Sequence, residues 1–132
     1  MIEFNQKEIE FLESLEEARI ATSHDNISHV KPVSFVFVDN TILVATDYNT
    51  RTFTNIKLNS HTSIVIDIYK LGEHKAICIQ GKTDIVEKGL EFKKFYKIFY
   101  KKFEWVRKDP WKEEEAAFLK IIPHNKISWG LN

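Results

Sequence analysis

The sequence predicts a mainly β domain of the α+β class, built as a small antiparallel barrel with helices packed outside it. Six or so short runs are apolar and β-branched or alternate apolar with polar residues, and turn-forming residues separate them. Few segments show helical spacing. A short sheet loses its exposed edges when it closes, which favours a barrel. With 132 residues and neither linker nor repeat, the chain is expected to form a single domain, residues 1–132.

The first part of the chain predicts one helix and then a meander of three strands. Asn5 followed by Glu8 resembles a capping box, and apolar residues continue after it at helical spacing. The next runs are rich in β-branched residues, and Asp-Asn pairs that tolerate positive φ separate them. We therefore expect strands at residues 19–23, 27–38 and 41–46.

The second of these strands has two unusual features. Residues 33–38 are apolar on both alternating faces, so one face must meet something besides the core. Pro32 has no N–H to donate, so the strand is expected to begin at an edge or to carry a bulge there. An unpaired edge is a natural place for a ligand.

The second half predicts a short helix, two strands, a longer helix and a closing strand. Thr50 is the expected N-cap of the short helix, and Gly81 indicates a bend or bulge. Glu113 to Glu115 suggest a solvated helix start, and Cys78 lies where a small buried residue is expected. The expected elements are helices at 50–58 and 92–103 and strands at 61–69, 75–86 and 117–122 with 126–129.

Residues 46–51, Thr-Asp-Tyr-Asn-Thr-Arg, join the third strand to the short helix and suggest a phosphate site. A helix start presents unpaired N–H groups and the positive end of the helix dipole, which together favour an anion. Arg51 adds a cation at that positive end, which is unfavourable unless an anion neutralises both. An ordinary capped surface helix with a solvated arginine explains the same residues, so the pattern suggests a site without establishing one.

Composition narrows the classes of function. The 19 basic and 19 acidic residues balance, which argues against a dominant nucleic-acid or membrane surface. One cysteine excludes an internal disulfide, and the five histidines lack metal-site spacing, so we expect no metal. No apolar N-terminal stretch resembles a signal peptide, and a cytoplasmic protein is expected. The lysines of the 92–103 helix leave nucleic-acid binding as a weak alternative, since its aromatic residues fall on the buried side.

The chain resembles the pyridoxamine 5'-phosphate oxidase-related, FMN-binding split-barrel family. The resemblance rests on the order and spacing of residues 18–67 and on the ending IIPHNKISWG. It implies a six-stranded antiparallel split barrel that forms a homodimer, with FMN in the grooves between subunits. In the family motif a strand-end threonine contacts the cofactor, and a hydroxyl-arginine-lysine run grips the phosphate. These positions fall on Thr46, Thr50, Arg51 and Thr52.

Thr52 departs from this motif, because the family has lysine there. A hydrogen bond to a charged group contributes about 1.5 to 3 kcal/mol, so losing the cation weakens binding by roughly one to two powers of ten. Lys57 on the same helix compensates on one interpretation and is a solvated helix cation on the other.

The resemblance also places the flavin ring against the second strand. The cofactor-binding residues it implies there are Lys31, Val33, Ser34 and Phe35. Lys31 lies near the ring on this interpretation, although a plain strand-edge lysine is the simpler alternative. Trp129, and the pair Trp105 and Trp111, are expected either to cover the groove from the partner subunit or to serve in packing.

The resulting hypothesis is an FMN-dependent oxidoreductase that accepts a hydride or electrons at the flavin and passes them to a small organic substrate or oxygen. The partners expected are a small-molecule substrate or NAD(P)H. No catalytic residue is indicated. True pyridoxamine-phosphate oxidases are longer, which argues against vitamin B6 oxidation. A flavin carrier or sensor without turnover would share every motif, and the barrel also hosts deazaflavin and haem binders.

Overall fold

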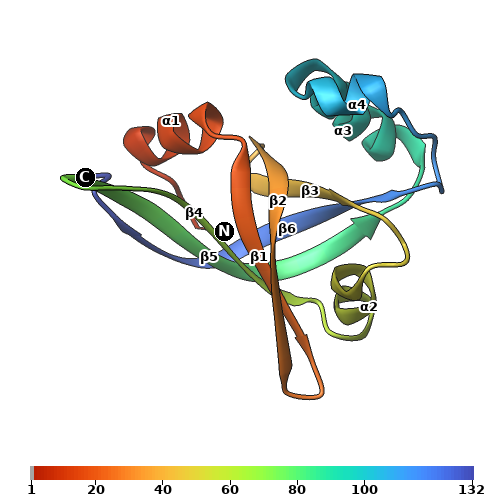
Figure 1. The fold of residues 1–132 in the computed structure, drawn as a ribbon, viewed down its shortest axis with the longest axis horizontal. Helices are drawn as coiled ribbons and strands as arrows, with labels where there is room; N and C mark the ends of the chain where they lie inside the picture. The colour runs from red at the N-terminus through yellow and green to blue at the C-terminus, as the bar shows by residue number, and fades with distance from the viewer. Residues whose placement is uncertain (1) are drawn as a thin grey trace.

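The computed structural model describes residues 2–132, in which six strands close into an antiparallel barrel with helices outside it (Figure 1). Around the barrel the order is β1-β2-β3-β6-β5-β4, which confirms the predicted six-stranded, mainly β fold. The strands are β1 (Glu17–His24), β2 (Ile27–Val38), β3 (Thr41–Thr46), β4 (His61–Lys70), β5 (Glu73–Val86) and β6 (Ala117–Trp129). The helices are α1 (Gln6–Ser14), α2 (Arg51–Leu58), α3 (Gly89–Lys102) and α4 (Glu104–Lys108).

The predicted local signals of the first part form as expected. The Asn5 side chain accepts a hydrogen bond from the Glu8 N–H at 2.8 Å, and the Glu8 carboxylate accepts one from the Asn5 N–H at 2.8 Å, completing the capping box. The turn between β1 and β2 holds Asp25 and Asn26 at φ of 53° and 62°, a conformation that their short polar side chains tolerate. Strands β1, β2 and β3 then pair as the predicted meander.

Strand β2 has an unpaired edge at Pro32, as predicted. Pro32 pairs with Arg19 of β1, whereas pairing with β3 begins only at Phe35. The N-terminal half of β2 therefore forms, with β1, a hairpin that projects from the barrel (Figure 1). One edge of that half is free of any strand among the described residues.

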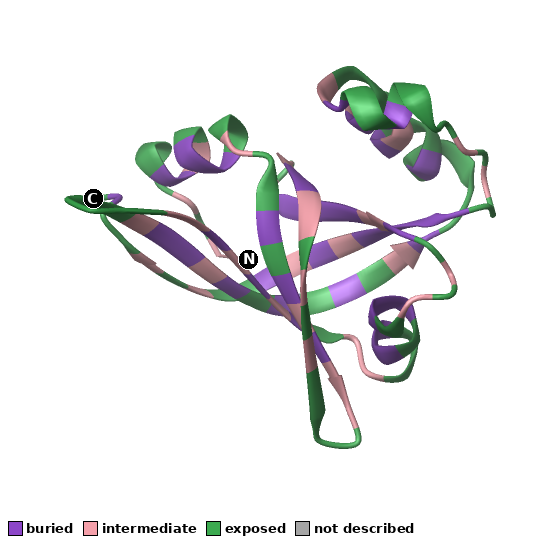
Figure 2. Ribbon diagram, in the orientation of Figure 1, coloured by how far each residue is buried: buried purple, intermediate pink, exposed green. Residues whose placement is uncertain are grey.

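The two apolar faces of β2 pack into two separate clusters. Phe35 lies inside the barrel with side chains such as Ile20, Ile66 and Leu119. Val36 points outward and packs with Leu43 and the phenylalanines of α3, which are Phe92, Phe95 and Phe99. The alternation of buried and exposed residues along the strands is visible in Figure 2. Helix α3 thus explains much of the second apolar face that the sequence assigned to a ligand or partner groove.

Gly81 sits at the predicted irregularity. The register between β5 and β6 shifts between Gln80 and Gly81, and a Cβ on Gly81 would lie 2.1 Å from the carbonyl oxygen of Ile122. Only glycine allows this close approach of two backbones. Strand β6 runs without interruption across this point, although the sequence suggested two pieces.

Two local expectations were wrong. Glu113 to Glu115 form a turn, not a helix start, with Glu114 at φ 67°. The chain instead makes the short helix α4 earlier, directly after α3. Cys78 is only half-buried, because it lies on the outward face of β5.

Candidate functional site

The turn between β3 and α2 is held by two threonine hydroxyls. Thr46 ends β3, and its Oγ1 lies 2.9 Å from Oγ1 of Thr50. The Thr50 hydroxyl also accepts a hydrogen bond from the Phe53 N–H at 3.1 Å, so Thr50 is the N-cap that the sequence predicts. The turn therefore fixes the first turn of α2 against the end of the barrel strand.

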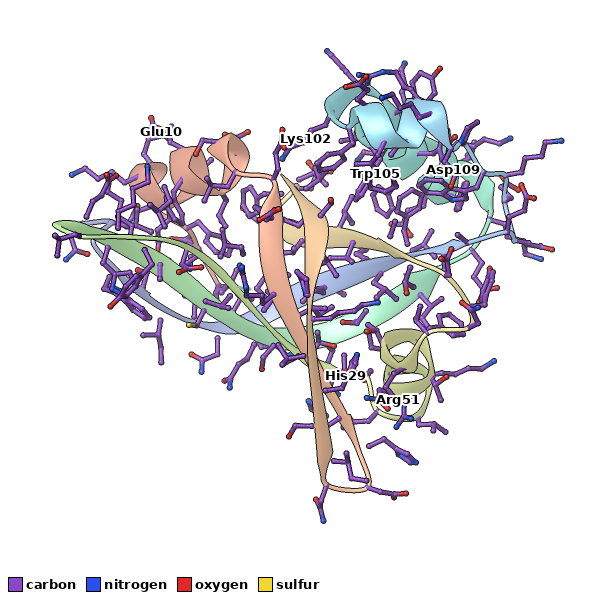
Figure 3. The ribbon with its side chains drawn as sticks, in the orientation of Figure 1. Glu10, His29, Arg51, Lys102, Trp105 and Asp109 are labelled. Atoms are coloured by element: carbon purple, nitrogen blue, oxygen red, sulfur yellow. The ribbon has the colours of Figure 1, made fainter. Side chains whose placement is uncertain are left out.

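Arg51 is the first residue of α2 and its side chain is exposed. It lines a hollow of about 500 Å³ together with His24, Asp25, His29 and Asn55. Figure 3 shows His29 and Arg51 on neighbouring elements. Within residues 2–132 no carboxylate lies within ion-pair distance of its guanidinium, whereas His24 is 3.3 Å from Asp25. A free guanidinium at the positive end of a helix, beside two imidazoles, makes this hollow suited to an anion.

The two histidines of this hollow were missed by sequence reasoning, which treated all five as dispersed polar residues. His24 ends β1 and His29 lies on the unpaired half of β2, so the projecting hairpin brings both beside α2. Asn55 secures the hairpin against the helix, because its Nδ2 donates to Thr22 Oγ1 at 3.1 Å. The signal available in the sequence was the tight Asp25-Asn26 turn, which folds the two histidines back toward each other.

Thr52, at the position of the family lysine, is buried with 1% of its surface exposed. Its hydroxyl has no hydrogen-bond partner, an unusual state for a buried polar group. No cation replaces the lysine at this position. Lys57 lies in the last turn of α2 with its Nζ 5.9 Å from the centre of the Phe53 ring, at the opposite end of the helix from Arg51.

Lys31 lies on the half of β2 that β3 does not pair with, opposite Ile20 of β1. Burial lowers the pKa of its ammonium group, and the charge of Asp47 opposes that shift. Lys31 is therefore a half-buried cation on the free edge of β2.

The other predicted contacts of β2 differ in their accessibility. Val33 and Ser34 are half-buried near the end of the free edge. The Phe35 side chain is fully buried in the barrel interior, and its carbonyl oxygen accepts a hydrogen bond from Lys102 Nζ at 3.3 Å. This hydrogen bond connects α3 to β2. Burial lowers the pKa of the Lys102 ammonium group.

Within one subunit, Trp129 lies far from Arg51 in space. It pairs with Ala76 and contacts His74 near the tip of the β4–β5 hairpin, and its ring centroid is 5.4 Å from that of His74. In Figure 1 this tip and α2 lie at opposite sides of the barrel. A shared site for Trp129 and Arg51 therefore needs a second subunit.

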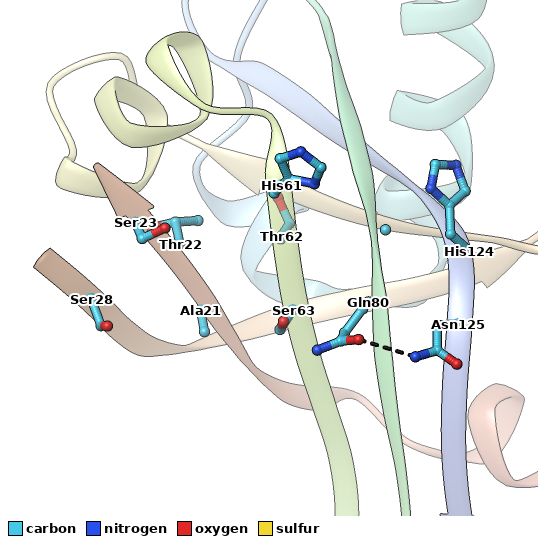
Figure 4. Close-up of a pocket in the computed structure, with 11 residues that line it drawn as sticks. Ala21, Thr22, Ser23, Ser28, His61, Thr62, Ser63, Gln80, His124 and Asn125 are labelled. Carbon is cyan, nitrogen blue, oxygen red and sulfur yellow. Dashed lines mark hydrogen bonds between the residues drawn. The ribbon is translucent and has the colours of Figure 1, made fainter. Parts of the chain in front are cut away.

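A second hollow of about 490 Å³ opens on the outer face of β1, β4, β5 and β6 (Figure 4). His61 and His124 flank it, and Asn125 Nδ2 donates to Gln80 Oε1 at 3.1 Å across it. Ser28 lines both this hollow and the one at Arg51. Beside this second hollow, the outer face of the sheet is mainly apolar. The side chains on that part of the face include Ala21, Val30, Val65, Cys78 and Ile127.

Across residues 2–132 no three His, Cys, Asp or Glu side chains are grouped so that they could hold a metal ion. None of the helices within that range combines the length and apolar character that a membrane span needs.

Residues 2–132 thus form a closed six-stranded antiparallel barrel with helices outside it. The family model described as pyridoxamine 5'-phosphate oxidase matches residues 4–126. The chain therefore belongs to the pyridoxamine 5'-phosphate oxidase family, and the resemblance found in the sequence is confirmed. A comparison with curated proteins found no match.

Solved structures of similar fold include two FAD-binding proteins and a heme storage protein. The heme storage protein HutZ from Vibrio cholerae is 15% identical with a TM-score of 0.82, covering 94% of this chain and 93% of that one. A FAD-binding protein from Mesorhizobium loti is 16% identical with a TM-score of 0.74, covering 91% and 88%. The FAD binding protein from Mycobacterium smegmatis is 21% identical with a TM-score of 0.67, covering 90% and 89%. At these identities the likeness shows the fold.

Proposed function

We propose that this protein binds FMN and acts as a flavin-dependent oxidoreductase on a small substrate. The observation that carries the proposal is the exposed guanidinium of Arg51, which has no ion pair within the described chain and stands at the N-terminus of α2. A phosphate there neutralises the guanidinium and accepts hydrogen bonds from the first N–H groups of the helix.

The surrounding residues fit a phosphate bearing a larger group. His24 and His29 add further hydrogen-bond donors around the hollow at Arg51. The Thr52 hydroxyl, which lacks a partner, lies in the same first turn of α2 and gains one if a small shift brings it to the phosphate. The missing lysine is thus offset by neighbours that the family motif does not include.

The free edge of β2 fits the remainder of the cofactor. It leads from the hollow at Arg51 toward Lys31 and offers unpaired backbone groups to the polar edge of a flavin ring. Lys31 would supply a positive charge there. The bound flavin would supply the electron transfer, while the chain's own residues hold its phosphate, orient its ring and exclude water.

A homodimer completes this arrangement. Helices α3 and α4 cover one side of the barrel, whereas the outer face of β1, β4, β5 and β6 has no partner within residues 2–132 (Figure 2). Ile127 on that face and Val30 of β2 beside it are 64% and 67% exposed. A second subunit packed there buries these side chains and brings its Trp129 toward the cofactor groove, which one subunit leaves open.

The test is to purify the protein, remove any chromophore and titrate it with FMN by fluorescence quenching. Arg51→Ala is expected to weaken FMN binding about 10- to 100-fold, with little change in the melting temperature of the cofactor-free protein. Lys57→Ala is the matched control, because it removes a cation from the other end of the same helix. Equal affinity in the Arg51 variant and the parent would remove the phosphate site. Reduction by NADH or NADPH in the steady state then separates an enzyme from a flavin carrier or sensor.

Haem is the second candidate cofactor. Its support is that HutZ, which has a similar fold, is a heme storage protein, and that histidines line both hollows of this chain. Absorbance after incubation with each compound separates the cofactors, because haem gives an intense Soret band whereas FMN and deazaflavin each absorb with a different profile. Preferential binding of haem or of a deazaflavin would replace FMN in the proposal.

A further inference from the structure

A third cavity, of about 480 Å³, lies between the end of β3 and the segment that follows α3. Its walls include Trp105 of α4 and Trp111 on one side and Thr46 and Asp47 on the other. Asp109 and Glu115 complete the polar part of the lining. Neither the family match nor the phosphate site accounts for this combination of aromatic rings and carboxylates.

The aromatic wall is held from behind. The rings of Trp105 and Trp111 are nearly parallel, with an interplanar angle of 8° and centroids 6.0 Å apart. Tyr96 meets Trp111 edge-on at 4.9 Å, and its hydroxyl accepts a hydrogen bond from the Trp111 backbone N–H at 3.2 Å. Phe103 stacks on Trp105 at 5.7 Å. Trp105 is nevertheless 43% exposed and lines the cavity, so part of its side chain is open to solvent although neighbouring rings hold it.

The charge of the lining is of one sign. Asp47, Asp109 and Glu115 are carboxylates, and no lysine, arginine or histidine belongs to the lining. In the described part of the chain none of the three forms an ion pair within 4.0 Å. Lys31 influences Asp47 from the side of β2, outside this cavity. An anion is repelled here, in contrast to the hollow at Arg51.

We propose that this cavity binds a small organic cation, that is, a protonated or quaternary amine. The faces of tryptophan rings attract such cations through their quadrupole, and nearby carboxylates add Coulomb attraction. A neutral aromatic ligand would use only the rings and would desolvate the carboxylates without return. Because Thr46 and Asp47 belong to both this cavity and the phosphate turn, the bound cation lies next to the proposed cofactor site.

The test uses choline as the probe and 3,3-dimethyl-1-butanol as its uncharged counterpart of the same shape. The cofactor-free protein is titrated with each compound at constant ionic strength, and the indole N–H resonances are followed by NMR. Choline is expected to shift the Trp105 and Trp111 resonances with a dissociation constant on the order of 1 mM. The backbone amide of Glu10, on α1 and outside this cavity, is expected to stay unchanged and serves as the internal reference.

Three variants sharpen the result. Trp105→Ala is expected to weaken choline binding about tenfold, and Asp109→Asn up to about fivefold, since both side chains are exposed and the fold should be retained. Glu104→Gln is the matched control, because its carboxylate pairs with Lys108 at 3.4 Å outside the cavity. Equal shifts with the uncharged compound, or unchanged affinity in both cavity variants, would overturn the proposal. Neither outcome bears on FMN binding, which is measured separately.

Discussion

The hydroxyl oxygens of Thr46 and Thr50 lie 2.9 Å apart and join the last residue of β3 to the N-cap of α2. The Thr50 hydroxyl also donates to the Asp47 carbonyl oxygen at 3.0 Å, which closes the turn on itself. Arg51 follows directly, so the position of its backbone is set by the barrel and not by the helix alone. The contact between Thr46 and Thr50 therefore fixes the geometry of the proposed phosphate site.

Replacement of Thr50 tests how much the turn contributes to stability. Thr50→Ala removes the cap of α2 and is expected to lower the free energy of unfolding by about 1 kcal/mol, whereas Thr50→Ser keeps the hydroxyl and most of that stability. Urea unfolding followed by circular dichroism measures both. If alanine and serine variants unfold at the same urea concentration, the hydroxyl does not stabilise the helix start.

Glu8 is expected to make folding stability depend on pH. Burial would raise the pKa of its carboxyl, but hydrogen bonds from Lys126, the Asn5 N–H and Ser128 hold it below the ordinary value of 4.5. A group with a lowered folded pKa stabilises the protein above its unfolded pKa and loses that contribution as the pH falls through the folded value. Glu8→Gln is therefore expected to cost about 2 to 3 kcal/mol at pH 7 and much less near pH 3.

The measurement is urea unfolding of parent and variant at several pH values between 7 and 3. Glu10→Gln is the control, because that carboxylate is exposed on the same helix (Figure 3) and its loss should change stability by less than about 0.5 kcal/mol. A difference between parent and Glu8→Gln that stays constant down to pH 3 would contradict the assigned pKa direction.

Gly81→Ala tests the close contact between β5 and β6. A Cβ at this position meets the Ile122 carbonyl oxygen at 2.1 Å, and backbone cannot yield as a flexible side chain can. We expect a loss of at least about 2 kcal/mol in the free energy of unfolding. Gln80→Ala, at the exposed neighbouring residue, should be nearly neutral. A fully stable Gly81 variant would show that the bulge accommodates a methyl group.

The proposed homodimer predicts a specific effect at the uncovered sheet face. Ile127→Asp places a charge in the middle of that face and is expected to convert a dimer into a monomer, because the buried interface cannot solvate the carboxylate. Leu71→Asp is the control, since Leu71 is fully exposed at the β4–β5 turn and away from that face. Light scattering reports the mass of each. A parent protein that is monomeric, or an Ile127 variant that stays dimeric, would move the interface elsewhere.

Much of the fold could be predicted because its signals are local. The Asn5 capping box, the Asp25-Asn26 turn and the Thr50 cap each depend on residues within a few positions, and each formed as expected. Gly81 was identifiable because a lone glycine in a strand indicates an irregularity. Helix α4 and the turn at Glu113 to Glu115 were not predicted, since their conformation depends on packing against α3 and β6.

For the candidate site, the sequence by itself determined the turn proposed to hold a phosphate, because a strand end, a hydroxyl cap and an arginine occur close together at residues 46–51. Only the tertiary structure decided what surrounds it. The projecting hairpin brings His24 and His29 to Arg51, and α4 brings Trp105 to Asp47, although these residues are far apart in the chain. Strand register and helix packing set such distances, and both depend on side chains throughout the barrel.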